Sequence, residues 1–455
     1  MAKKLHIQTY GCQMNVYDSE RIAEVLAPLG YVLSDTSEDA DMVILNTCHI
    51  REKAAEKVYS KLGRLRKQKE KKEQTGGRMI LGVTGCVAQA EGSEVLRRAP
   101  YVDMVFGPQT YHRLPEMVAK ASRANGHVLD TDFPEDNKFD SLPKTRTAEG
   151  ATAYLSIQEG CDKFCTYCVV PYTRGAEYSR PTAQVLDEAR ALIKAGVSEI
   201  TLLGQNVNAY HGENEDGSTC TLADLVRKVA TLDGLDRIRY LTSYPAEMTD
   251  DLILAHAEVT ELMPYLHLPI QAGSDQVLKA MNRQHTVAEY KLIVEKLRKA
   301  VPGIALSSDF IVGFPGETDA DFEETMALVE EMRFIQAYSF KYSSRPGTPA
   351  ALLESQDLYR VPEALKAERL ARLQALLNAN TLAFNKQAVG QTYPVLLDRT
   401  GKTPGMLVGR SPYMQAVVVK AEDHLLNTLQ NVLITEAGPN SLNGELVETL
   451  HRALA

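Results

Sequence analysis

The sequence predicts an α/β protein with three parts. These are an N-terminal parallel α/β domain over residues 1–122, a central partial (βα)6 TIM-like barrel over 147–380, and a small C-terminal β-barrel over 381–446. In the first two parts, short apolar segments alternate with helix-like segments, which is typical of parallel sheets covered by helices. The last part has short strand-like segments separated by Gly, Pro and Asn turns, which is typical of a small antiparallel barrel.

In the N-terminal part, each expected strand is followed closely by a cysteine. Strands are expected at 4–9, 41–47 and 79–85, helices at 17–29 and 51–72, and the cysteines are Cys12, Cys48 and Cys86. Because the carboxyl ends of parallel strands meet at one edge of a sheet, we expect the three thiols to lie together. Three such thiolates could bind an iron–sulfur cluster. The alternative is that they are ordinary buried thiols, which are common in cores.

The central part contains six strand-like segments separated by helices. Strands are expected at 154–158, 200–203, 238–241, 266–270, 305–312 and 337–342, and helices at 182–195, 222–232, 250–258, 287–301 and 319–333. Units of roughly 25 to 40 residues suit the βα repeats of a barrel. Six units are too few to close an eight-stranded barrel, so we expect an open side that would admit a bulky substrate.

The loop after the first central strand carries Cys161, Cys165 and Cys168 in a Cys-x3-Cys-x2-Cys arrangement. A [4Fe–4S] cluster usually takes four protein thiolates, so a site with three leaves one iron able to bind another ligand. The alternative is a structural zinc site with a distant fourth ligand, but such sites usually show two ligand pairs. Since the loop lies at the carboxyl end of its strand, we expect these cysteines at the face where barrel active sites form.

This spacing matches the signature of the radical S-adenosylmethionine (SAM) superfamily, in which the open iron holds SAM, and Tyr167 also fits that pattern. Together with the three N-terminal cysteines, it resembles the radical SAM methylthiotransferases over essentially the whole chain. The resemblance implies two [4Fe–4S] clusters, an auxiliary one on Cys12, Cys48 and Cys86 and a catalytic one on Cys161, Cys165 and Cys168. It also implies that the C-terminal barrel is an RNA-binding TRAM domain.

Other polar residues at the carboxyl ends of the central strands are candidates for binding SAM or substrate, because backbone amides and helix N-termini there can bind carboxylate or ribose oxygens. The expected SAM contacts are Tyr167, Gln205, Asn206, Gln271 and Glu317. An ordinary structural role is the alternative, since Gly-Pro-Gly sequences form turns and Glu317 could cap a helix.

Local sequence also indicates a substrate. The runs at 9–15, 46–54 and 168–175 resemble the family branch that acts on N6-dimethylallyladenosine in tRNA, although His49 departs from the small polar residue expected there. The resemblance implies methylthiolation of carbon 2 of this base at tRNA position 37, next to the anticodon. One SAM would serve as radical source, a second as methyl donor, and the auxiliary cluster would provide the sulfur. Alternatives are another tRNA adenosine, a ribosomal protein, or a non-catalytic RNA-binding module.

The expected partners are a tRNA anticodon loop, an electron donor such as flavodoxin or ferredoxin, and a sulfur source. Proteins can read the splayed bases of single-stranded loops, and a dimethylallyl group would require an apolar wall in the pocket.

No stretch of 18 apolar residues is present, so we expect no membrane span. The absence of an apolar leader and the use of cysteine predict a cytoplasmic protein in a reducing compartment.

The charge of the chain gives little support for RNA binding by itself, because the net charge is −9. Between residues 389 and 446 we find four Lys/Arg against five Asp/Glu, and Arg399, Lys402 and Arg410 could share one face. A purely structural barrel is therefore an alternative. The run at 64–72 is more basic, and it is either a solvated helix face or a second phosphate contact.

Overall fold

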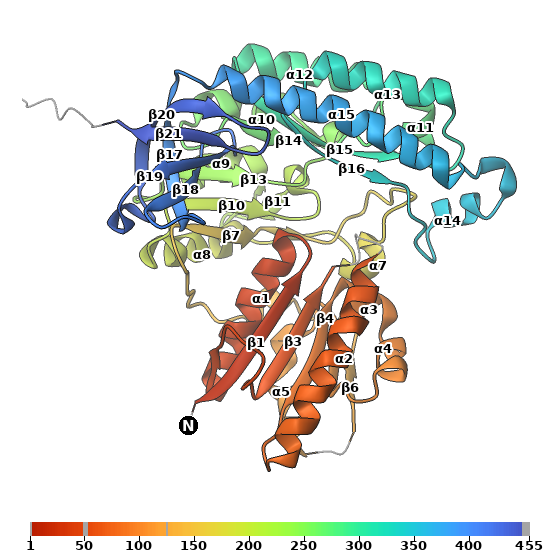
Figure 1. The fold of residues 1–455 in the computed structure, drawn as a ribbon, viewed down its shortest axis with the longest axis vertical. Helices are drawn as coiled ribbons and strands as arrows, with labels where there is room; N and C mark the ends of the chain where they lie inside the picture. The colour runs from red at the N-terminus through yellow and green to blue at the C-terminus, as the bar shows by residue number, and fades with distance from the viewer. Residues whose placement is uncertain (1, 49–52, 124–125, 448–455) are drawn as a thin grey trace, which may run out of the picture.

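The structure is a computed structural model that describes residues 2–48, 53–123 and 126–447 (Figure 1). It contains the three expected parts: a parallel α/β domain, a curved α/β core and a closed β-barrel. His49 and part of the run at 46–54 lie outside the described residues.

The N-terminal domain is built on a six-stranded parallel sheet in the order β2-β1-β3-β4-β5-β6. Its strands are β1 (Lys3–Tyr10), β2 (Tyr31–Leu33), β3 (Met42–Thr47), β4 (Ile80–Gly85), β5 (Met104–Phe106) and β6 (Val128–Asp130). Every residue of β3 and β4 is buried. Their sequences are mostly apolar, as expected for parallel strands that helices cover on both faces. The three expected strands are confirmed. The other three strands, β2, β5 and β6, have only three residues each, which is too short for a recognisable pattern of apolar residues.

Helices cover both faces of this sheet. They are α1 (Gln13–Leu26), α2 (Lys53–Gln74), α3 (Cys86–Glu91), α4 (Ser93–Arg98) and α5 (Leu114–Arg123), with short η1 (Ala27–Leu29) and η2 (Tyr111–Arg113). Tyr17 and Ile22 of α1 pack with Leu114 of α5 on one face, and Leu62 of α2 packs in a separate core on the other. A short α6 (Lys138–Ser141) leads into the central part.

The central part has six parallel strands, as expected: β7 (Thr152–Ser156), β10 (Glu199–Leu203), β13 (Arg237–Tyr240), β14 (Tyr265–His267), β15 (Ala305–Val312) and β16 (Gln336–Lys341). A parallel bridge from Ile238 to Leu262 joins the first three strands to the last three. Among the described residues no pairing joins β16 back to β7, so the barrel is open between these strands.

Helices cover the outer face of the curved sheet and enclose the largest apolar core. They are α8 (Thr182–Lys194), α9 (Leu222–Ala230), α10 (Asp250–Glu258), α12 (Val287–Ala300), α13 (Asp319–Met332) and α15 (Glu363–Gln387). Shorter elements lie in the connecting loops: β8 (Gln158–Glu159), α7 (Val170–Arg174), β9 (Tyr178–Ser179), η3 (Val207–Ala209), β11 (His211–Glu213), β12 (Thr219–Thr221), η4 (Pro245–Glu247), α11 (Asp275–Ala280), α14 (Pro349–Glu354) and η5 (Asp357–Tyr359).

The C-terminal barrel closes in the strand order β17-β18-β19-β21-β20. Its elements are β17 (Thr392–Thr400), β18 (Met406–Arg410), β19 (Ala416–Lys420), η6 (Asp423–Leu425), β20 (Leu429–Ala437) and β21 (Leu442–Leu446). The expected β-barrel is confirmed. Residues 381–387, which we placed with it, form the end of α15, because the strand-like pattern begins only near Tyr393.

The C-terminal barrel is attached to the central part through buried arginines of β13. Arg237 and Arg239 lie 3.4 and 3.1 Å from the carboxylate of Glu199, which offsets part of their charge. Their guanidinium groups donate hydrogen bonds of 2.5 to 3.0 Å to the backbone carbonyls of Pro394, Arg410, Ser411 and Pro412. Hydrogen bonds from a charged donor are among the stronger ones in proteins, so these four bonds attach the barrel to the core. Within the described part of the chain, no helix is long and apolar enough to span a membrane.

Candidate active site

The loop that carries Cys161, Cys165 and Cys168 follows β7 at the carboxyl-end face of the open barrel. The three thiols are free and partly buried. The Cys168 amide donates to the carbonyl of Cys165 at 2.9 Å, which folds the end of the loop into a tight turn. Burial raises the pKa of Cys161 and raises that of Cys168 to about 12. Binding iron would therefore release protons from these thiols.

Gly160 fixes the start of this loop. Its φ angle is +78°, and a Cβ there would lie 1.9 Å from the carbonyl oxygen of Ala176. Its amide donates a 2.6 Å hydrogen bond to Oε1 of Gln205, at the end of β10. The loop can therefore reach its position only with glycine, and it is tied to the neighbouring strand.

The opposite side of the loop is held by Arg283, a residue that the sequence analysis missed. Its Nη1 lies 3.8 Å from Sγ of Cys165, and its Nη2 donates to the carbonyl of Pro269 at 2.5 Å. The nearby backbone of Met281 accepts a hydrogen bond from the Thr166 amide at 3.0 Å. No motif marks Arg283, because more than a hundred residues separate it from the loop.

Two of the expected SAM contacts, Gln205 and Asn206, lie directly beside the cysteine loop. Their amides both donate to Oε1 of Gln158 at 3.0 Å, so the backbone here is fixed. The Asn206 side chain is only 2% exposed, and within the described residues neither its Oδ1 nor its Nδ2 has a hydrogen-bond partner. Buried polar atoms are normally paired, so this amide fits a bound polar ligand such as SAM.

The other three expected contacts have different surroundings. Tyr167 lies close to Arg283, and its burial raises its pKa well above the usual range. Gln271 has a φ of +84° and bridges to β15 through its own amide and carbonyl, both at 3.0 Å. The Glu317 carboxylate accepts from the amide of Gly313 and from Arg369, and burial raises its pKa to about 6. Their contact with SAM stays a prediction, and Glu317 already has partners in its own chain.

The structure brings Cys12, Cys48 and Cys86 together at the carboxyl edge of the N-terminal sheet. Cys12 precedes α1 and Cys86 begins α3, while Cys48 follows β3 and hydrogen-bonds to both of the others. These bonds are the largest cause that lowers the pKa of Cys12 to about 7 and that of Cys86 to about 6. The pKa of Cys48 is raised by the same bonds. The ready deprotonation of Cys12 and Cys86 suits metal ligands.

Glycines shape the space around these thiols. A Cβ at Gly11 would lie 2.4 Å from Cβ of Cys48, and a Cβ at Gly85 would lie 2.4 Å from the carbonyl oxygen of Thr47. Both residues have positive φ angles, +143° and +89°. The backbone therefore approaches the cysteines more closely than any other residue would allow, and the three-thiol donor set fits a cluster.

Arg174 connects the two cysteine sets. Its guanidinium donates to Glu159 next to the Cys161 loop and to Asp18 of α1, both at 2.7 Å, and it also hydrogen-bonds to Cys86. Lys138 joins the same buried network 2.5 Å from Glu159. In Figure 1, α7, which ends at Arg174, lies beside α3, and the two helices are in contact.

The basic run at 64–72 lies on α2, and three of its six basic residues form ion pairs within the N-terminal domain. Arg66 binds Glu70 at 2.7 Å on the exposed face of the helix. Lys69 binds Asp103 and Lys72 binds Asp41, also at 2.7 Å. These pairs favour the interpretation of a solvated helix face.

Three family models match the chain in order. Residues 4–107 match "Uncharacterized protein family UPF0004", residues 155–329 match the radical SAM superfamily, and residues 386–447 match the TRAM domain. Together these domains are the signature of the radical SAM methylthiotransferases. The chain belongs to this family.

The fold of this methylthiotransferase is similar to solved radical SAM enzymes. It matches the radical SAM methyltransferase TsrM from Kitasatospora setae with a TM-score of 0.56 and 13% identity, over 77% of this chain and 75% of that chain. It also matches the cobalamin-dependent SAM radical enzyme OxsB with a TM-score of 0.51 and 12% identity, over 83% of this chain and 56% of that chain. At these identities the likeness shows the fold alone.

Proposed function

We propose that this enzyme methylthiolates carbon 2 of N6-dimethylallyladenosine at position 37 of tRNA. The product is 2-methylthio-N6-dimethylallyladenosine. The observation that carries the proposal is the placement of two three-thiol sets on facing parts of the N-terminal domain and the core, joined by Arg174. An open barrel and an adjoining TRAM barrel would receive an RNA loop beside them.

The residues of the chain have distinct parts in this proposal. Cys161, Cys165 and Cys168 would hold one [4Fe–4S] cluster, and Cys12, Cys48 and Cys86 would hold the other. When bound, these clusters and SAM would supply the radical chemistry, the sulfur and the methyl group. Asn206 would offer SAM its side-chain amide, which has no partner among the described residues, and Arg174 binds the N-terminal domain to the core. An electron donor such as flavodoxin or ferredoxin and a sulfur source complete the requirements.

The test is an anaerobic assay of the reconstituted enzyme with SAM, a reductant and an anticodon stem-loop that carries N6-dimethylallyladenosine. Mass spectrometry of the RNA should show the methylthio group, and chromatography should show 5′-deoxyadenosine. Cys161→Ala should lose both products. Cys220→Ala is the matched control, because Cys220 is a buried core thiol of β12 that belongs to neither set.

Two outcomes would contradict the proposal in different ways. If the wild type forms 5′-deoxyadenosine but leaves the RNA unchanged, the substrate is wrong while the radical SAM assignment stands. If a ribosomal protein supplied in place of the RNA becomes methylthiolated while the RNA does not, the enzyme belongs to the protein-modifying branch. Iron analysis gives an independent readout, because two clusters require roughly eight irons per chain.

A further inference from the structure

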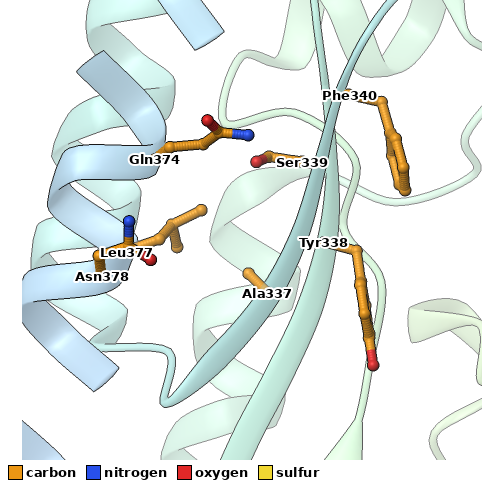
Figure 2. A pocket seen from close by; sticks show the side chains of 7 residues that line it. All are labelled: Ala337, Tyr338, Ser339, Phe340, Gln374, Leu377 and Asn378. Carbon is orange, nitrogen blue, oxygen red and sulfur yellow. The ribbon is translucent and has the colours of Figure 1, made fainter. Parts of the chain in front are cut away.

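Two exposed aromatic side chains lie on the inner face of β16, the edge strand of the open barrel. Tyr338 is 44% exposed and Phe340 is 36% exposed. Figure 2 shows both side chains pointing away from α15, whereas Ser339 on the same strand points toward Gln374 of that helix. Since alternate residues of a strand face opposite sides, Tyr338 and Phe340 share the face turned away from the covering helix.

This face continues onto β15 inside the barrel. The parallel register places Tyr338 beside Asp309 and Phe340 beside Ile311. Phe310 has the opposite orientation and is fully buried in the apolar core under the helices. Tyr338, Phe340, Asp309 and Ile311 therefore line the interior of the barrel, where two aromatic rings and one aliphatic chain form an apolar wall next to a carboxylate.

Contacts connect this wall to the cysteine loop. The Tyr338 ring lies 6.1 Å from the imidazole of His267 in an edge-to-face arrangement. His267 Nε2 lies 3.5 Å from Oδ2 of Asp309, and Asp309 is close enough to Tyr167 to influence its hydroxyl electrostatically. Tyr167 stands directly before Cys168. A molecule against Tyr338 would thus sit on the same side of the barrel as the candidate cluster.

Asp309 has a hydrogen-bonding capacity that the fold leaves unused. Its Oδ1 is buried and has no hydrogen-bond partner among the described residues, while its Oδ2 faces His267. A buried carboxylate oxygen without a donor is costly, so such a group in a pocket is suited to an N–H from a ligand.

We propose that Tyr338, Phe340 and Ile311 hold the unstacked adenine and its N6-alkyl group, and that Asp309 accepts a hydrogen bond from N6–H. This inference rests on the proposed function and adds the residues that select the base. Aromatic side chains stack on splayed RNA bases, and an alkyl group gains free energy by leaving water for an apolar wall. Because N6 and carbon 2 lie on either side of N1, a contact at N6 also orients carbon 2.

The test measures binding of fluorescent anticodon stem-loops to the reconstituted holoenzyme, by anisotropy, with RNA that carries either adenosine or N6-dimethylallyladenosine. Tyr338→Ala should weaken binding of both RNAs roughly 10- to 100-fold, the range of a lost base stack. Phe340→Ala should reduce the preference for the dimethylallyl RNA at least tenfold. Ser339→Ala, whose side chain lies toward α15, is the control and should bind as the wild type does. Tyr338→Phe, which keeps the ring, should recover most of the binding that Tyr338→Ala loses.

The outcomes separate this inference from the proposed function. If the wild type binds and modifies the RNA but Tyr338→Ala and Phe340→Ala bind it equally well, the wall is elsewhere and the function stands. If the wild type binds a ribosomal-protein peptide and neither RNA, both are wrong. Iron content and circular dichroism of each variant show whether a loss of binding is caused by unfolding. If Tyr338→Ala does not fold, Tyr338→Phe tests the stacking role instead. Weak RNA binding by folded Tyr338→Phe would also overturn that role.

Discussion

Arg174 of the core donates a 2.7 Å hydrogen bond to Asp18 of the N-terminal domain, and both side chains are almost completely buried. The pair joins two domains whose cysteines lie far apart in sequence. Its second partner, Glu159, lies one residue before Gly160, at the start of the Cys161 loop. The Arg174 guanidinium, together with Lys138, thus links the loop of one cysteine set to the domain that carries the other.

Replacing Arg174 should weaken the junction between these domains. In Arg174→Gln, Asp18 loses its nearest buried cation and Glu159 keeps only Lys138, and removing one partner of a buried pair costs about 3–5 kcal/mol. We expect a lower free energy of unfolding, measured by urea denaturation, and loss of iron from the N-terminal site. Arg190→Ala is the matched control, because Arg190 and its partner Asp187 are 56% and 77% exposed, and such a pair contributes less than about 1 kcal/mol. Equal destabilisation by both variants would contradict this role.

Gly160→Ala should disrupt the loop that carries Cys161, Cys165 and Cys168 without unfolding the protein. The added Cβ would lie 1.9 Å from the carbonyl oxygen of Ala176, so the backbone must move. We expect loss of about half the bound iron and of 5′-deoxyadenosine formation, measured by iron analysis and chromatography. Gly63→Ala is the control: Gly63 lies in α2 with open space around it, and this substitution should stabilise the helix by about 0.5–1 kcal/mol. Full iron content in Gly160→Ala would contradict the prediction.

The stability of the core should depend on pH through His256. Burial lowers the pKa of this imidazole to about 4, and its Nε2 lies 2.6 Å from the Tyr240 hydroxyl. Because the folded pKa lies below the unfolded value of 6.5, the neutral ring contributes stability that is complete above pH 6.5. That contribution is lost as the pH falls toward 4 and amounts to about 3 kcal/mol.

The measurement is urea unfolding of wild type and His256→Gln at several pH values. The variant should lose less stability than the wild type between pH 6.5 and 4. His424→Gln, at a side chain that is 69% exposed, serves as the control and should keep the wild-type pH dependence. Identical pH profiles for wild type and His256→Gln would exclude this residue as the source.

Arg237→Met should loosen the C-terminal barrel while leaving its own fold intact. The variant leaves the carbonyls of Pro394 and Arg410 without their donor, and each buried bond to a charged group contributes about 1.5–3 kcal/mol. Hydrogen exchange should become faster at the interface strands β13 and β17. Lys420→Ala, at an exposed residue of β19, should show no change. Unchanged exchange in Arg237→Met would show that other contacts hold the barrel.

Much of the architecture could be predicted from the sequence, because its signals are local. The apolar runs before Cys12, Cys48 and Cys86 predicted both the sheet and the edge at which these thiols meet. The three-residue strands β2, β5 and β6 are too short to produce a periodic pattern. They take their conformation from pairing with neighbouring strands.

The contacts around the site could not be predicted, since they join residues without a shared motif. Arg283 reaches Cys165 from the far side of the barrel. Asp309 lies within a strand-like segment and belongs to no motif. Its proximity to His267 depends on the register between β14 and β15. Arg410, a candidate phosphate ligand from the sequence, instead donates to the carbonyl of Met414 and is partly buried against the core.

The attachment of the C-terminal barrel has an evolutionary consequence. Arg237 and Arg239 bind backbone carbonyls, which are present whatever side chain a residue carries. Substitutions on the barrel therefore leave its anchorage unchanged as long as the strands keep their path. Selection is therefore free to alter the outer side chains of this barrel without changing how the barrel is attached to the core.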